Sequence, residues 1–215
     1  MLHPRPPYFS ILIISAAALA YEVLLMRLFS IIQWHHFAYM VISLALLGYG
    51  VSGTFLFLTR QWLIPRFAEA FVANTTLFGL SSIGCYMLAQ QIPFNILEIV
   101  WDPDQWLFLL LNYLLLIIPF FFAANAICLS FIKFNQQIPK IYAFDLTGAG
   151  LGALGVIIAL YLLKPSGVLQ LIAVAGLLAS VVAAFESRIS AAQAGGAHSA
   201  GSPAAAGAVD SSEDV

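Results

Sequence analysis

Charged side chains are scarce in this chain of 215 residues: Asp, Glu, Lys and Arg make up 8% of it, whereas 62% is hydrophobic. Soluble domains carry about 25% charged residues, which supply the polar surface that water requires. The shortage excludes an ordinary water-soluble enzyme, and the lack of basic tracts excludes a nucleic-acid-binding protein. A mean hydropathy of +0.96 indicates a polytopic membrane protein instead, with the lipid bilayer as its surroundings.

Cysteine is also rare. The two cysteines, Cys85 and Cys128, both lie in apolar runs, which indicates neither a disulfide framework nor a thiolate metal site. The motifs H-E-x-x-H, G-x-S-x-G and C-x-x-C are missing as well. The sequence therefore predicts no catalytic residue, metal or cofactor, and it gives no indication that the chain is an enzyme on its own.

Six apolar segments are long enough to cross a bilayer, which takes about 20 residues in a helix. They predict an all-α fold, a six-span transmembrane bundle over residues 1–189. The segments are 9–32, 38–59, 69–90, 105–131, 144–163 and 167–185. Residues 190–215 are mostly Ala, Gly and Ser, and they offer too little apolar surface to offset the entropy of ordering. We therefore predict a disordered tail there.

The basic residues predict the orientation of the bundle, because cytoplasmic loops of membrane proteins are enriched in Lys and Arg. If the N-terminus is cytoplasmic, Lys164 falls outside and Arg27 falls within the first span. The other basic residues are then all cytoplasmic: Arg5, Arg60, Arg66, Lys133, Lys140 and Arg188. We therefore expect both termini in the cytoplasm.

Glycine runs occur in the second and fifth segments, as Gly-Tyr-Gly-Val-Ser-Gly at 48–53 and Gly-Leu-Gly-Ala-Leu-Gly at 150–155. Each matches a dinucleotide-binding pattern, but neither follows a strand as that site requires. Small residues in membrane helices let two backbones approach closely. We therefore predict close helix packing at Gly48, Gly50, Gly53, Gly148, Gly152 and Gly155.

The positions of the two glycine runs suggest an internal repeat. Each run lies in the middle segment of a three-segment half, about a hundred residues from the other. Two halves with an odd number of spans have opposite orientations in the membrane, as in the inverted repeats of many secondary transporters. The sequence therefore raises the alternative of a 3+3 inverted repeat.

Polar side chains at membrane depth mark candidate sites, because a charge there costs at least ~2.5–3.5 kcal/mol. Glu22 lies within about 3 Å of the middle of the first segment, where it is either protonated or bonded to another helix. Arg27 can reach the outer surface, and we expect Asp145 at the cytoplasmic start of the fifth segment. Asn112 and Asn125 lie on either side of the middle of the fourth.

His35 and His36 follow the first segment at the predicted outer surface. Such a pair can contact a metal, a haem or a quinone. A membrane haem needs axial ligands from facing helices, and the predicted spans contain no other histidine. We interpret the pair as part of an interfacial polar and aromatic girdle and retain a cofactor contact as the alternative.

Two stretches carry a family resemblance: ALAYEVLLMRL at 18–28 and YAFDLTGAGLGAL at 142–154. Together they resemble the membrane half of the spermidine-synthase-like membrane proteins, in which several helices precede a soluble aminopropyltransferase-type domain. The resemblance covers about residues 10–185. The residues after it show no strand pattern, so we expect no transferase domain here and carry over no catalytic residue.

Two functions follow as hypotheses. The resemblance implies a non-catalytic subunit or anchor in a bacterial inner membrane, with a separate polyamine-related transferase, another complex or a second copy as partner. The alternative is a small secondary transporter or channel for a cationic or proton-coupled substrate, which rests on Glu22 and on the suggested repeat.

Overall fold

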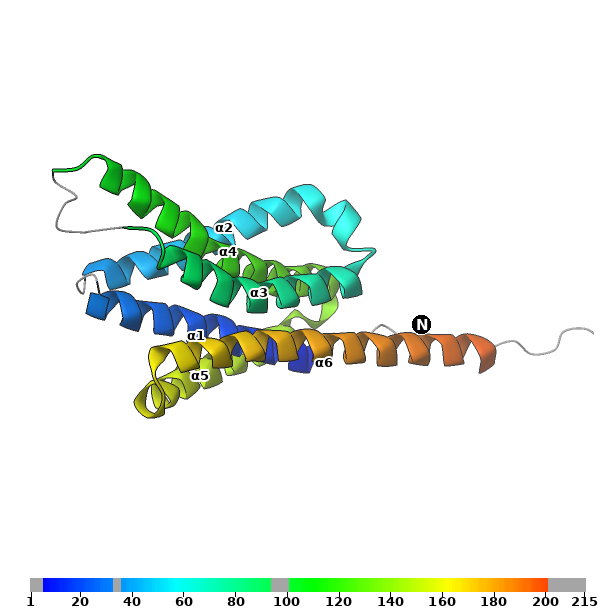
Figure 1. Cartoon of the computed structure of the whole chain (residues 1–215). Helices are drawn as coiled ribbons and strands as arrows, with labels where there is room; N and C mark the ends of the chain where they lie inside the picture. The colour runs from blue at the N-terminus through cyan, green and yellow to red at the C-terminus, as the bar shows by residue number, and fades with distance from the viewer. Residues whose placement is uncertain (1–5, 33–35, 94–100, 201–215) are drawn as a thin grey trace, which may run out of the picture.

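The structure is a computed structural model, which describes residues 6–32, 36–93 and 101–200. In these ranges it has six long α-helices and no strand (Figure 1). They are α1 (Tyr8–Ile32), α2 (His36–Leu63), α3 (Phe67–Ala89), α4 (Asp104–Lys133), α5 (Ile138–Leu162) and α6 (Pro165–Ala200), with the 3-10 helix η2 (Asn135–Gln137) before α5. All six are long and apolar enough to cross a membrane. The predicted all-α bundle of six spans is confirmed.

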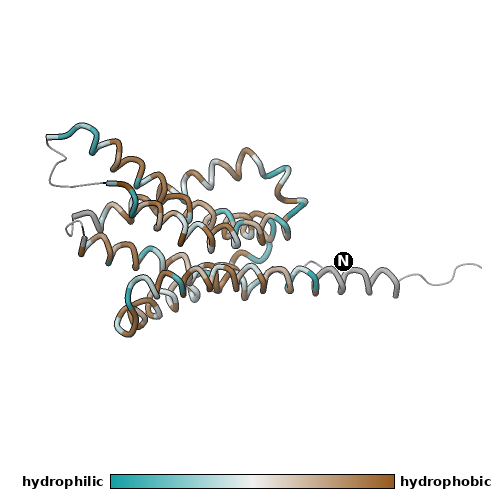
Figure 2. The backbone as a smooth tube through the Cα atoms, viewed as in Figure 1, coloured by the Kyte–Doolittle hydropathy of each residue, from teal (hydrophilic) through white to brown (hydrophobic). Residues whose placement is uncertain are grey.

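The outer surface of the bundle is apolar. Figure 2 shows hydrophobic residues along the length of the helices, and large side chains such as Leu151, Leu154 and Ile157 of α5 are exposed. A water-soluble protein rarely exposes apolar patches of this extent. The surface therefore fits contact with lipid.

Helix α1 is the central helix, because it packs against α5, α6 and α2 and also touches α4. Its side chains Tyr21, Leu24 and Leu25 are fully buried. The Tyr21 ring centroid lies 5.3 Å from that of Phe120 in α4 and 6.3 Å from that of Phe78 in α3. Helices from both halves of the chain therefore meet at this aromatic cluster.

The pairing of the helices follows a two-fold pattern. The first helix of one half, α1, packs on α5 and α6, and the first helix of the other half, α4, packs on α2 and α3. The third helices, α3 and α6, pack on each other. A two-fold axis that exchanges the halves produces these pairs. The pairing therefore favours the inverted repeat that the glycine runs suggested.

The third helices meet at two glycines that the sequence analysis did not single out. A Cβ on Gly79 of α3 would lie 3.0 Å from the carbonyl oxygen of Ala173 in α6. A Cβ on Gly176 of α6 would lie 3.0 Å from the Cα of Gly79. Because neither position has room for a larger side chain, each glycine lets the partner helix approach closely.

Close packing is also found between α5 and α1, at two of the predicted glycines. Gly148 faces the backbone of Leu12, and Gly152 faces the backbone of Ala16. A Cβ on Gly152 would lie 2.6 Å from the Cα of Ala16. The two glycines are four residues apart, so they share one face of α5.

Within the described chain, close packing is found at three of the six predicted glycines. Gly48 of α2 does pack on α4, where a Cβ would lie 2.7 Å from the Cβ of Phe120. Around Gly50, Gly53 and Gly155, however, no atom of the described chain lies within 4 Å of a Cβ. Residues two or five apart lie on different faces of a helix, at about 100° per residue, so one run cannot bury all its glycines against one partner.

The largest differences from the predicted boundaries are at the start of α5 and at the end of α6. Helix α5 begins at Ile138 rather than at residue 144, because Pro139 suits the first turn of a helix and the polar residues before the apolar run continue it. Helix α6 continues to Ala200, so residues 190–200 are helical where we predicted disorder. Alanine has the highest helix propensity, and an existing helix extends without a new nucleation cost. The rest of the predicted tail, 201–215, lies outside the described residues.

Candidate intramembrane acidic site

Asp145 lies deeper in the bundle than predicted. Because α5 begins at Ile138, Asp145 is about two turns inside the helix and not at its cytoplasmic start. Its Oδ1 accepts a hydrogen bond from the Oγ of Ser15 in α1, and its side chain is half-buried. The carboxylate is therefore held between two helices at membrane depth.

Glu22 lies on the same side of α1 as Ser15. Seven residues separate the two, which is close to two helical turns and about 10 Å along the axis. The Glu22 side chain is half-buried, and within the described chain it has no hydrogen bond and no ion pair. The interhelical bond that was one of our two expectations for Glu22 is therefore not formed with any described side chain.

Tyr49 of α2 lies near the two carboxyl groups. Its hydroxyl lies within electrostatic range of both Asp145 and Glu22. Ser15, Glu22, Tyr49 and Asp145 together form what we call the acidic site, at the junction of α1, α2 and α5. Cys128 of α4 is also within electrostatic range of Asp145.

Sequence reasoning missed two members of the acidic site. Ser15 is one of many serines in apolar segments, and only its spacing of seven residues from Glu22 could have suggested it. Tyr49 stands within the glycine run, where nothing distinguishes it from a packing side chain.

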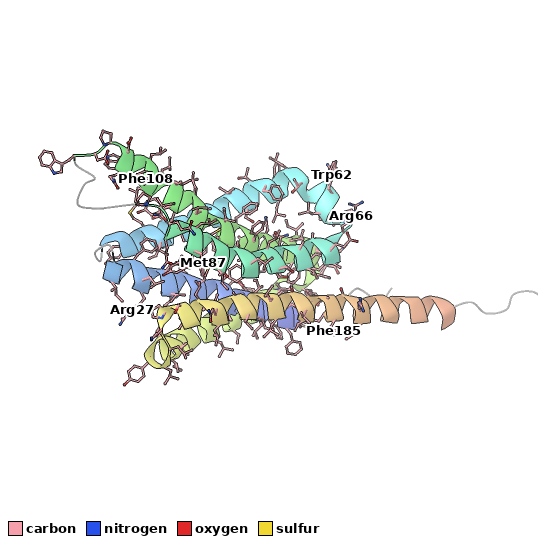
Figure 3. All side chains as sticks on the ribbon, viewed as in Figure 1. Arg27, Trp62, Arg66, Met87, Phe108 and Phe185 are labelled. Carbon is pink, nitrogen blue, oxygen red and sulfur yellow. The ribbon has the colours of Figure 1, made fainter. Side chains whose placement is uncertain are left out.

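Arg27 lies away from the acidic site. It is twelve residues beyond Ser15 on α1, a rise of about 18 Å, and it is exposed. Figure 3 shows Arg27 and Arg66 near opposite ends of the bundle. Arg27 forms no ion pair with Asp145 or with any other residue in the described ranges, as its predicted depth implied.

The two asparagines of α4 are buried and also separate from the acidic site. The Oδ1 of Asn125 accepts a hydrogen bond of 2.7 Å from the Oγ of Ser52 in α2. Asn112 lies on the same helix, thirteen residues before Asn125. The Ser52–Asn125 bond joins α2 to α4, as the Ser15–Asp145 bond joins α1 to α5.

Only one member of the histidine pair belongs to the described residues. His36 is the first residue of α2, and His35 lies outside the described residues. Among the side chains that the structure describes, no group of three His, Cys, Asp or Glu is placed to hold a metal ion.

The acidic site can bind a proton or a cation. It contains two carboxyl groups, a phenol and a serine hydroxyl. Carboxylate oxygens can bind a proton, and carboxylate and hydroxyl oxygens can coordinate a cation. Comparison of the chain with protein-family models, with curated proteins and with solved structures gave no match. The resemblance to the spermidine-synthase-like membrane proteins therefore stays a prediction from the residues.

Proposed function

We propose that this chain is a small secondary transporter or channel that carries a proton or a small cation through the acidic site. The observation that carries the proposal is the pair of carboxyl groups, Glu22 and Asp145, on two different helices of the bundle. No residue of the described chain forms an ion pair with either of them. An ionisable group inside a membrane bundle marks a functional site by default, because it is costly to retain.

The depth of the two carboxyl groups supports this proposal. Glu22 is nine residues from the end of the span Tyr8–Ile31, and Asp145 is seven residues after Ile138, the first residue of α5. At 1.5 Å per residue, they lie about 14 Å and about 10 Å from those ends. A glutamate or aspartate side chain is too short to reach water over that distance, so both depend on a partner or a bound ion.

The helix pairing is the second support. Secondary transporters built from inverted repeats bind their substrate near the middle of the membrane, at the interface between the repeats. The acidic site has this position, because Glu22 and Tyr49 belong to the first three helices and Asp145 to the last three. A shift of one half relative to the other would change the distances between these side chains.

Ion flux into proteoliposomes tests the proposal. We expect the wild-type protein to pass protons, followed with a pH-sensitive dye, or alkali cations, followed with cation-sensitive dyes. The substitutions Glu22→Gln and Asp145→Asn should abolish the flux and leave the folded fraction unchanged. Glu69→Gln removes an exposed carboxylate at the start of α3 and should have no effect. Wild-type rates in both site variants, or no flux from the wild-type protein, would refute the proposal.

A second candidate function is that of a membrane subunit, which the outer face of α5 favours. Helix α5 packs almost entirely on α1, and the rest of its surface is exposed and apolar. No described atom lies within 4 Å of a Cβ on Gly150 or Gly155. We propose that a helix of a separate transferase, or of another complex, packs on the face that carries Gly150.

Native mass spectrometry of the protein from its own membrane tests the subunit proposal. A stoichiometric partner chain should be present, and Gly150→Leu should remove it. Gly84→Leu, at a glycine of α3 that also has open space, should leave the partner bound. A monomer in mild detergent, or a partner that both variants retain, would contradict the proposal.

A further inference from the structure

A pocket of about 220 Å³ lies between the ends of α1, α3, α4 and α6. Its walls are largely apolar and include Pro7, Phe71 and Ala183. Two charged side chains, Lys133 and Glu186, also line it. The pocket is separate from the acidic site, with which it shares no residue.

The pocket lies at the level of the membrane surface. Pro7 directly precedes the first span, Phe67 is the first residue of the third, and Lys133 is the last residue of the fourth. All these residues belong to one end of the bundle, which the basic residues predict to be cytoplasmic. At this level the headgroups of the inner leaflet meet their acyl chains.

Both carboxylate oxygens of Glu186 accept hydrogen bonds from the start of α1. The Glu186 Oε1 accepts a hydrogen bond of 3.2 Å from the backbone N–H of Phe9. Its Oε2 accepts bonds of 3.3 Å from the backbone N–H and 2.5 Å from the Oγ of Ser10. Glu186 thus caps the first turn of α1, where the helix dipole is positive.

The positive charge of the pocket is compensated only in part. The Lys133 Nζ donates one hydrogen bond of 3.2 Å to the carbonyl oxygen of Ile64. An ammonium group has three hydrogens, so two donors remain for a ligand. Phe67 and Ala68 also line the pocket, and as the first residues of α3 they present backbone N–H groups that the helix itself does not use. Lys133 and the first turn of α3 therefore leave hydrogen-bond donors free for an anionic ligand.

We propose that this pocket binds the phosphate headgroup of an anionic phospholipid. Lys133 and the first turn of α3 contact the phosphate oxygens, and the apolar walls contact the glycerol and the start of an acyl chain. Pockets between membrane helices that present basic side chains on the cytoplasmic side suit such headgroups, and here Lys133 has that position. The bound lipid would join α3 and α4 to α1 and α6, whose ends surround the pocket.

Lipid titration of the delipidated full chain, followed by native mass spectrometry, tests the proposal. Phosphatidylglycerol should bind more tightly than phosphatidylcholine. Lys133→Gln should weaken phosphatidylglycerol binding by about tenfold, because it removes a charge-assisted contact. Lys140→Gln, a matched change at an exposed lysine near the same end, should leave the affinity unchanged. Equal affinities in the wild type and Lys133→Gln, or an equal loss in both variants, would overturn the proposal.

A steric variant tests the pocket without changing its charge. Ala68 is exposed and lines the pocket, whereas Ala73 is exposed on the same helix and does not. Ala68→Trp should fill the pocket and lower phosphatidylglycerol binding, and Ala73→Trp should not. Circular dichroism checks that both variants are folded. Inorganic phosphate that binds through Lys133 while the lipid does not would assign a free-phosphate site and overturn the lipid proposal.

Discussion

The contact between Gly152 of α5 and Ala16 of α1 gives a sharp test of how the bundle is packed. A Cβ on Gly152 would lie 2.6 Å from the Cα and 2.7 Å from the carbonyl carbon of Ala16. Ordinary contacts between carbon atoms are about 3.5–4.0 Å. The substitution Gly152→Ala therefore requires the two helices to separate by about 1 Å, because both obstructing atoms belong to the backbone.

This separation affects most of the packing of α5, because α5 contacts the rest of the bundle almost entirely through α1. Overpacking of a well-packed core costs about 1–3 kcal/mol, and we expect Gly152→Ala to lower the free energy of unfolding by that amount. Gly155→Ala is the matched control. No described atom lies within 4 Å of a Cβ there, and alanine favours a helix over glycine by up to about 1 kcal/mol.

The two substitutions are identical in chemistry and three residues apart, yet we expect opposite signs. Unfolding in mixed micelles with a rising fraction of a denaturing detergent, followed by circular dichroism, measures both. Gly152→Ala should unfold at a lower fraction than the wild type, and Gly155→Ala at the same or a higher one. Equal midpoints for the two variants would refute the packing of α5 on α1 that the structure shows.

Three further predictions concern the other interhelical contacts and the orientation. Ser52→Ala should destabilise the fold by about 0.6 kcal/mol, typical of a hydrogen bond between membrane helices; a double-mutant cycle with Asn125→Ala measures it, and a coupling energy of zero would contradict the bond. Glu186→Gln should lower the melting temperature in detergent, because the cap of α1 is worth about 1 kcal/mol; an unchanged melting curve would exclude that role. In a cysteine-free background in intact cells, an impermeant reagent should label a cysteine placed at Lys164 and not one placed at Gln136; the reverse pattern would invert the predicted topology.

The six helices were predictable because each needs only local information. A run of about 20 apolar residues has few alternatives to a membrane helix, and all six runs coincide with helices. The ends of the helices were less predictable, because polar residues outside an apolar run can continue its helix. The start of α5 at Ile138 and the extension of α6 to Ala200 are both of this kind.

The acidic site was predictable only in its charged members. Glu22 and Asp145 stand out by residue type in apolar segments, but the depth of Asp145 depends on where α5 begins. Ser15 and Tyr49 join the site because α1 lies beside α2 and α5. That arrangement depends on which helices pair, and a single sequence does not state the pairing.

The glycines show the same limit. The pattern of the two runs indicated close packing, and Gly148 and Gly152 are packed because their spacing of four residues places them on one face. The faces that carry Gly50 and Gly53 are turned away from the bundle. Composition identified helices that pack closely. The pairing of the helices in three dimensions decides which of their glycines lie at a contact.

The two-fold pairing also bears on why the bundle retains Asp145. Contact of α2 with α4 and contact of α5 with α1 are equivalent under the suggested repeat, and each has a side-chain hydrogen bond that a serine donates. The first uses neutral groups, Ser52 and Asn125, and the second uses Ser15 and Asp145. An asparagine could accept the same bond from Ser15 without the cost of a carboxylate in the membrane. Packing alone therefore does not require the acid, and its proximity to Tyr49 supports a role in binding a proton or a cation.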